Sequence, residues 1–253
     1  MVLVKPYEKE FVLEKINEYN KKIKLGKSGR HEILKKDGIK ENMNGYLHDI
    51  DEDIDMPVLE LRSDDKYWMR LDIREVESTY FIIKNAHGNV GIVGLGLGYT
   101  VNEIAKNKKV KSVTVYEFSE DVIKLYENSF KKNPKIKIVK GDAYKAKAKT
   151  FDYFFVDIYE YKLSDKVVSD YEFFNKLHKI EDYVFWGVEH FLLSCSYEEI
   201  VWVYIPELWM ELSKNIFSRV QEAGYLETYK QLDSNLVHEV LSKFKKVLNS
   251  NME

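Results

Sequence analysis

Short apolar runs alternate with helix-like segments through the middle of the chain, from about residue 90 to residue 188. The runs are rich in Val, Ile, Phe and Tyr, which is typical of buried strands, and apolar positions recur at helical spacing between them. Such alternation predicts a doubly wound parallel sheet, because right-handed crossovers place helices on both faces. The strands are expected at residues 90–93, 112–116, 136–139, 151–157 and 183–188, and the intervening helices at 99–106, 119–130 and 170–179.

The residues before this region show a different pattern. Apolar residues at helical spacing between 7 and 25 predict an N-terminal helix. Residues 31–71 form short segments separated by turn signals, among them Asp37-Gly38 and Asn44-Gly45, which predict a small antiparallel β appendage. We interpret the acidic run at residues 49–55 as a solvated loop, because it lacks the bend glycine and the spaced terminal Glu of a calcium loop.

The residues after the last expected strand are mostly helical. Residues 206–223 and 234–248 have helical spacing, whereas V-W-V-Y-I before Pro206 fits either a strand or a helix. The predicted fold class is therefore α/β, a three-layer, doubly wound Rossmann-like fold. We expect two parts: an N-terminal helix and β appendage at residues 1–72, and an α/β domain with a helical C-terminal extension at residues 73–253.

Composition and charge exclude several functional classes. The chain is 45% hydrophobic and 32% charged with a net charge of -3, so as a whole it attracts neither a membrane surface nor nucleic acid. Cys195 is its only cysteine, which excludes an intrachain disulfide and a cysteine-rich zinc site. The N-terminus lacks the apolar core of a signal peptide, and no stretch reaches the length of a membrane span. We therefore expect a cytoplasmic protein without membrane association.

A glycine-rich turn, V-G-I-V-G-L-G-L-G-Y-T at residues 90–100, follows the first expected strand. Alternating glycines let the backbone adopt positive φ and approach a ligand closely. The free N–H groups of the following helix suit an anionic or polar group. Gly94, Gly96 and Gly98 are therefore candidate cofactor-binding residues.

Carboxylates stand at the ends of the next strands, and these ends share one edge of a parallel sheet, where ligands bind. Glu117 follows the second strand about 20 residues after the glycines, which suits hydrogen bonds to ribose hydroxyls. A dinucleotide fingerprint needs glycine where the chain has Tyr99. Asp142, followed by Ala143, can accept from an adenine amino group. Together these residues favour an S-adenosyl ligand over a dinucleotide.

The segment from residue 90 to residue 161 resembles the cofactor half of class I S-adenosylmethionine-dependent methyltransferases, and within them it is similar to the spermidine synthase branch. The glycine turn, the V-T-V-Y-E step and the G-D-A turn carry the resemblance. Ile92 adds to it, since many methyltransferases have an acidic residue there and aminopropyltransferases an apolar one. The resemblance implies that S-adenosylmethionine is bound with its methionine over Gly94, Gly96 and Gly98, its ribose at Glu117, and its adenine at Asp142 and Ala143.

Two positions depart from the spermidine synthase pattern. Leu97 stands where those enzymes have an Asp beside their cationic amine substrate, and their D-x-x-D appears here as Asp157-Ile-Tyr-Glu160. Asp157 and Glu160 are the candidate catalytic residues, with Glu160 a candidate base that frees an acceptor amine for in-line attack.

Three functions remain open. Methyl transfer from S-adenosylmethionine to an unidentified acceptor leads, aminopropyl transfer from decarboxylated S-adenosylmethionine is the alternative, and a non-catalytic nucleoside-binding or structural protein is the third. A small-molecule acceptor is favoured and a nucleic acid is not expected, because the lysines at residues 106–111, 131–137 and 140–149 fit a solvated surface. We expect no metal, since Glu189-His190 is interpreted as a hydrogen-bonded pair at a strand end, and a homo-oligomer is left open.

Overall fold

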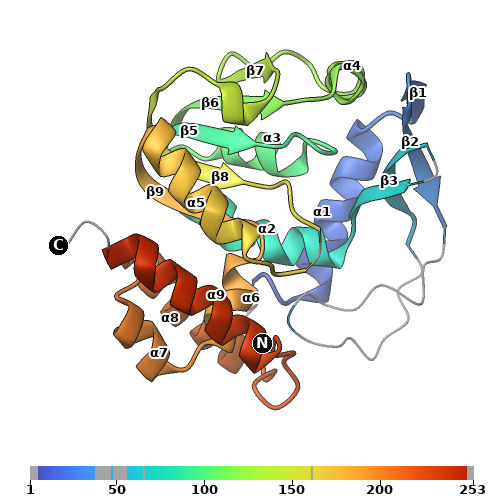
Figure 1. Cartoon of the computed structure of the whole chain (residues 1–253). Helices are drawn as coiled ribbons and strands as arrows, with labels where there is room; N and C mark the ends of the chain where they lie inside the picture. Colours follow the sequence, from blue (N-terminus) through green and yellow to red (C-terminus); the bar gives the residue numbers. More distant parts are fainter. Residues whose placement is uncertain (1–4, 38–46, 48–55, 65, 161, 250–253) are drawn as a thin grey trace.

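A five-stranded parallel sheet forms the centre of the computed structural model, which describes residues 5–37, 47, 56–64, 66–160 and 162–249 (Figure 1). The strand order is β7-β6-β5-β8-β9, so the order reverses between β5 and β8. Ile92 of β5 pairs with Val115 of β6 on one side and with Phe155 of β8 on the other. The strands are β5 (Gly88–Val93), β6 (Val110–Glu117), β7 (Ile136–Lys140), β8 (Thr150–Val156) and β9 (Lys179–Phe185).

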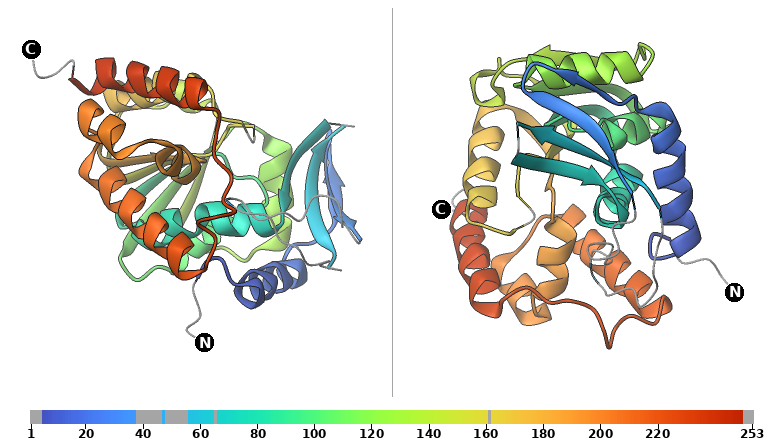
Figure 2. Two further views of the ribbon diagram at one scale, coloured as in Figure 1. Left: turned by 90° about the horizontal axis from the view of Figure 1, so that it is seen from below. Right: turned by 90° about the vertical axis from the view of Figure 1, so that its right-hand side faces the viewer.

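Helices cover both faces of this sheet, as the alternating pattern predicted. Figure 2 shows α5 and α9 on one face and α2 on the other. The central strands are apolar because both of their faces are buried, and Phe154, Phe155 and Val156 have no exposed surface. The predicted α/β, doubly wound fold is confirmed. The helices flanking the strands are α2 (Ile73–Asn85), α3 (Tyr99–Lys106), α4 (Glu120–Ser129) and α5 (Lys166–Leu177).

The last helix and strand of the sheet begin earlier than predicted. The helix expected at 170–179 is α5, which begins at Lys166, and the strand expected at 183–188 is β9, which ends at Phe185. His178 ends α5 in an extended conformation, and Gly187 at φ 93° caps a further helix, α6 (Val188–Ser194). The apolar run at residues 183–188 therefore spans a strand end and a helix start.

An N-terminal helix, α1 (Lys9–Lys22), and a four-stranded antiparallel sheet precede α2. Three strands match the predicted segments, whereas the three-residue β1 was not predicted. The turn at Asn44-Gly45 and the acidic run at 49–55 lie outside the described residues. The division at residue 72 stays a prediction. The strands are β1 (Gly26–Ser28), β2 (His31–Lys36), β3 (Val58–Ser63) and β4 (Lys66–Leu71).

Three C-terminal helices follow α6, and two of them, α8 and α9, contact the edge strand β9. The three are α7 (Tyr197–Val203), α8 (Glu207–Glu222) and α9 (Ser234–Asn249). Trp209 of α8 is fully buried, and its Nε1–H donates to the Tyr183 carbonyl of β9 at 2.7 Å, which occupies an acceptor of the sheet edge. V-W-V-Y-I is resolved as the end of α7, with Tyr204 in the left-handed region at φ 62°.

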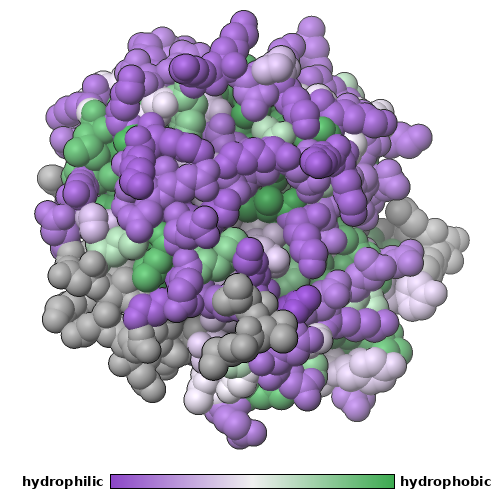
Figure 3. Space-filling view, turned by 180° about the vertical axis from the view of Figure 1, so that it is seen from behind, coloured by the Kyte–Doolittle hydropathy of each residue, from purple (hydrophilic) through white to green (hydrophobic). Residues whose placement is uncertain are grey.

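The outer surface is mainly polar, as expected of amphipathic helices around an apolar core. Figure 3 shows hydrophilic residues over most of the face opposite to that of Figure 1, with only scattered apolar patches. Within the described ranges, no helix combines the length and hydropathy needed to cross a membrane.

Candidate cofactor and acceptor site

A cavity of about 1050 Å³ lies at the carboxyl ends of β5, β6 and β8. These ends point toward the antiparallel sheet (Figure 1), and β3 and β4 supply the opposite wall. The cavity is at the reversal of strand order, where open α/β sheets bind their ligands. Most of the sequence-predicted site residues line it: Gly94, Gly96, Glu117, Asp142, Ala143, Asp157 and Glu160.

The first glycine of the turn is required by the neighbouring strand. Gly94 has φ +101°, and its N–H donates to the Tyr116 carbonyl at 3.0 Å. A Cβ at this position would overlap the carbonyl oxygen of Asp157, whose own N–H donates to the Val93 carbonyl at 2.8 Å. Only glycine therefore lets the ends of β5 and β8 come this close together.

The other two glycines differ in what they contact. Gly96 lies against the Met69 sulfur of β4, and the Leu97 N–H donates to that sulfur at 3.1 Å, so the antiparallel sheet covers the turn. Gly98 caps α3, is not among the residues lining the cavity, and faces the Tyr126 ring, which a Cβ would approach to 2.6 Å. Gly98 thus serves helix packing in this structure.

The Glu117 carboxylate is fixed by the backbone around it. Its Oε2 accepts the Leu95 N–H at 3.0 Å and its Oε1 accepts the Ser119 N–H at 2.7 Å. Burial raises its pKa, and these backbone hydrogen bonds oppose the rise. A carboxylate held in this way keeps lone pairs available for hydroxyl donors in the cavity.

Asp142 lies at the rim of the cavity, two residues after the end of β7. Its Oδ1 accepts the Tyr144 N–H at 3.0 Å and so caps a short 3₁₀ turn, Ala143–Lys145, while Lys145 Nζ lies 3.8 Å from Oδ2. Ala143 is buried. Asp142 is therefore a turn cap whose second oxygen lies at the rim of the cavity.

Two carboxyl groups that line the cavity, Glu75 and Asp157, have raised pKa values, and so does Asp72, three residues before Glu75 in the chain. Burial raises the pKa of Asp157 to about 7. Burial, and then the neighbouring Asp157 charge, raise the pKa of Glu75 well above its usual range, although Thr100 Oγ1 donates to Glu75 at 3.1 Å. Burial also raises the pKa of Asp72, the cap of α2, to about 6. Burial and the neighbouring charge therefore favour the protonated form of Glu75, while Asp157 titrates close to neutrality.

Glu160 lies at the mouth of the same cavity. Its side chain is 86% exposed, and its carboxylate is 3.6 Å from the Lys66 ammonium of β4. It stands beyond Asp157 on the loop after β8, so the two candidate catalytic carboxylates occupy different depths.

Sequence reasoning missed a hydrogen-bonded group in the wall between β8 and α5. Asp170 of α5 accepts from the Tyr144 hydroxyl at 2.7 Å and from the Tyr159 hydroxyl at 2.9 Å. Lys166 Nζ is 2.6 Å from the same carboxylate. Two tyrosines that line the cavity are thereby held by one buried aspartate.

Asp170 carried a signal in the sequence, because it shares a helix face with the buried Val167 and Phe174. A carboxylate on an apolar face has to be paired. The sequence carried no such signal for Glu75 and Met69, because they belong to elements that lie far along the chain from the strand ends of the parallel sheet.

The expected Glu189-His190 pair is wrong. Both residues lie in α6, after a glycine, and their side chains have different surroundings. The two Glu189 carboxyl oxygens are buried without a hydrogen-bond partner among the described residues, and burial raises the pKa of Glu189 well above its usual range. His190 Nε2 instead lies 2.7 Å from the Lys230 carbonyl. Within the described part of the chain, no three His, Cys, Asp or Glu residues form a group that could hold a metal.

Part of the chain that lines this cavity matches a known family. Residues 88–188 match the sequence model of the family described as ribosomal RNA adenine dimethylase. No curated protein was found to match the chain in sequence.

Two solved structures are similar in shape. Wild-type Trm5b from Pyrococcus abyssi has a TM-score of 0.39 at 14% identity, over 73% of this chain and 48% of that one, so the chain spans about half the length of Trm5b. Spermidine synthase from Thermotoga maritima has a TM-score of 0.38 at 16% identity, over 79% of this chain and 63% of that one.

The expectation of a small-molecule acceptor, with no nucleic acid, is wrong. The family whose model matches residues 88–188 is described by an activity on ribosomal RNA, which points to RNA and not to a small molecule. The error came from using the net charge of -3 for the whole chain. A net charge averages over all faces and says nothing about one basic surface.

The order of the strands, the glycine turn, the carboxylates at the strand ends and the family match agree with one another. The chain has a class I S-adenosylmethionine-dependent methyltransferase-like fold, with S-adenosylmethionine as the implied cofactor.

Proposed function

We propose that this protein transfers a methyl group from S-adenosylmethionine to a base of RNA, with an adenine amino group as the first acceptor to test. The observation that carries the proposal is the match of residues 88–188 to the ribosomal RNA adenine dimethylase family, since this segment supplies the sheet edge of the cavity.

The residues of the cavity suit this cofactor. Glu117 offers a fixed carboxylate for the ribose hydroxyls, and Asp142 and Ala143 at the end of β7 suit the adenine. Gly94 and Gly96 leave room for the methionine portion beside β4. The volume of about 1050 Å³ leaves space for a second group, as transfer requires.

Asp157 is the residue best suited to manage the proton of an acceptor amine. When bound, S-adenosylmethionine supplies a methyl group on a positively charged sulfur, so the new N–C bond forms as the C–S bond breaks and its electron pair stays on sulfur. The acceptor nitrogen then has one proton to lose, and Asp157, with a pKa of about 7, can accept it near neutral pH. Positioning supplies the larger part of the rate in this chemistry.

A basic segment beside the cavity favours RNA as the partner. Residues 131–149 contain eight lysines and one acidic residue, Asp142. This segment includes the edge strand β7 and runs past the cavity lining at residues 141–144. Phosphate backbones bind such local clusters of lysine whatever the net charge of the whole protein.

The test uses S-adenosylmethionine with a labelled methyl group and purified ribosomal RNA, followed by mass analysis of the nucleosides. We expect label in methylated adenine, and labelling slower by about 100-fold or more with the Asp157→Asn variant. A parallel reaction with decarboxylated S-adenosylmethionine and a diamine tests aminopropyl transfer. Aminopropylated diamine without RNA methylation would overturn the proposal, as would cofactor binding without transfer to any RNA.

A further inference from the structure

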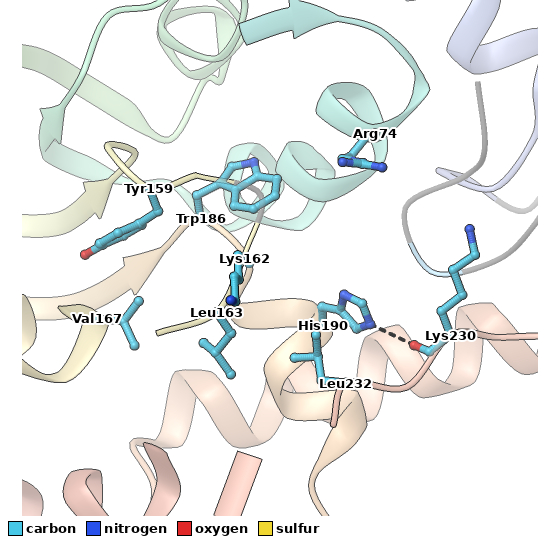
Figure 4. Close-up of a pocket in the computed structure, with 10 residues that line it drawn as sticks. Arg74, Tyr159, Lys162, Leu163, Val167, Trp186, His190, Lys230 and Leu232 are labelled. Carbon is cyan, nitrogen blue, oxygen red and sulfur yellow. Dashed lines mark hydrogen bonds between the residues drawn. The ribbon is translucent and has the colours of Figure 1, made fainter. Parts of the chain in front are cut away.

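A second, smaller cavity adjoins the first on the side of β9. It has a volume of about 170 Å³, and its described lining contains basic residues and no aspartate or glutamate. The basic residues come from four separate elements: Arg74 of α2, Lys162 after β8, His190 of α6, and Lys230 before α9. Figure 4 shows the Arg74 guanidinium, the Lys162 ammonium and the His190 ring around one space below Trp186.

The electrostatics of this basic pocket favour an anion. Burial lowers the pKa of His190, and the charges of Lys230 and Arg74 lower it further, while its hydrogen bond to the Lys230 backbone opposes the shift. Because a carbonyl oxygen only accepts, His190 Nε2 carries the hydrogen in the 2.7 Å bond to Lys230. His190 thus holds the Lys230 segment in place within a positive field.

Two aromatic side chains separate the basic pocket from the cofactor cavity. Tyr159 and Trp186 line both cavities. Tyr159 is held by its 2.9 Å hydrogen bond to Asp170 and by an edge contact with the Phe185 ring, so this part of the wall is rigid. A ligand that passes this wall meets carboxyl groups on one side and cationic groups on the other.

A nucleotide likewise has two chemically different parts, which match the two cavities. Its base is an aromatic amine, and its phosphate is an anion that arginine and lysine bind through charge-assisted hydrogen bonds. A volume of 170 Å³ is far above the ~15 Å³ that a single water needs, and it accommodates a phosphate group.

We propose that the basic pocket holds a backbone phosphate of the acceptor RNA, so that one nucleotide bridges the two cavities with its base toward Asp157 and its phosphate toward Lys162 and Arg74. This inference rests on the proposed function, and it adds the contact that distinguishes a nucleotide in a chain from a free base. Lys162 is the main contributor, because its side chain is exposed to the incoming strand.

The direct test is calorimetric titration of pyrophosphate into protein saturated with S-adenosylhomocysteine, which keeps the probe out of the cofactor cavity. We expect binding by the wild type and at least tenfold weaker binding by Lys162→Glu. Arg74→Gln should weaken it as well. Lys176→Glu is the matched control, because Lys176 is an exposed lysine of α5 outside the pocket lining, and it should bind as the wild type does.

The second test measures methylation of RNA by the same variants. Lys162→Glu should raise the KM for RNA about tenfold, leave kcat and the affinity for S-adenosylhomocysteine within twofold, and reduce the slope of log KM against log salt by about 0.7. Pyrophosphate binding that Lys162→Glu retains, or an unchanged KM for RNA, would overturn the inference. Because pyrophosphate binding needs no methyl transfer, Lys162-dependent binding supports the anion site even where the proposed function fails.

Discussion

The two neighbouring cavities differ in charge although they share a wall. The cofactor cavity has protonatable carboxyl groups at its floor, with Asp157 and Glu75 both shifted upward by burial. The smaller one presents Arg74 and Lys162. Two neighbouring cavities can therefore have opposite charge in a protein whose net charge is only -3.

The carboxyl groups of the cofactor cavity suit the proposed methyl transfer, in which a sulfonium cation is consumed and a proton is released. A positively charged sulfur becomes a neutral thioether, and the acceptor amine releases a proton. The ionised form of Asp157 would stabilise the positive charge on sulfur and accept the proton that the amine releases. The basic side has no part in this step, and it is suited to recognition.

The largest expected effect comes from the acidic floor. Asp157→Asn should lower kcat for RNA methylation by about 100-fold or more, which is the usual contribution of a general base. The affinity for S-adenosylmethionine should change little, because Asn is isosteric. Rate against pH sharpens the result: the wild-type kcat/KM should rise as pH passes through about 7. A variant that keeps the wild-type rate and pH profile would remove Asp157 from the mechanism.

The next effect separates cofactor binding from catalysis. Glu117→Ala removes a carboxylate that also holds the Leu95 and Ser119 N–H groups. Loss of charged hydrogen bonds costs about 1.5–3 kcal/mol each, so the Kd for S-adenosylmethionine should rise by about tenfold or more. Calorimetry measures the Kd. Glu117→Gln keeps a hydrogen-bond acceptor, so its Kd should lie between those of Glu117→Ala and the wild type. Unchanged affinity would contradict the ribose assignment.

The cofactor side of this comparison was largely predictable from sequence, for a topological reason. In a parallel sheet the carboxyl ends of the strands meet at one edge, so local motifs such as Gly94 and Glu117 fall together without knowledge of the remaining contacts. The same reasoning did not distinguish Gly98, which packs against Tyr126 of α4, from Gly94 and Gly96, which line the cavity.

The basic pocket was not predictable, because its residues come from segments that are far apart in the sequence. Arg74, Lys162, His190 and Lys230 belong to four elements and share no spacing. Glu75, whose pKa is raised by burial and then by the Asp157 charge, likewise comes from a helix that precedes the parallel sheet. RNA was not expected as a partner for a related reason, since the net charge of the whole chain conceals local basic surfaces.

A smaller effect is expected from the basic segment beside β7. Lys145, whose side chain is 85% exposed, follows the cavity lining, so Lys145→Glu should raise the KM for RNA roughly threefold and lower the salt slope by about one phosphate contact. Lys176→Glu is the matched control, because this exposed lysine of α5 lies outside the basic segment and lines neither cavity. Equal effects of the two variants would argue against an RNA path across the cavity rim.

The smallest effect concerns stability, and it has an unusual sign. Because folding raises the pKa of Asp157 from 3.8 to about 7, the folded state binds this proton more tightly than the unfolded state. The resulting stability is fully present below about pH 4 and is lost as pH rises through about 7, opposite to a salt-bridged carboxylate. Asp157→Asn is neutral at every pH, so it should match the wild type near pH 4 and melt higher at pH 8, by about 2–4 °C for each kcal/mol. Thermal unfolding between pH 4 and pH 8 measures the difference. If the two curves stay parallel across this range, the Asp157 carboxyl group is not protonated by the fold, and its assignment as the proton acceptor loses its basis.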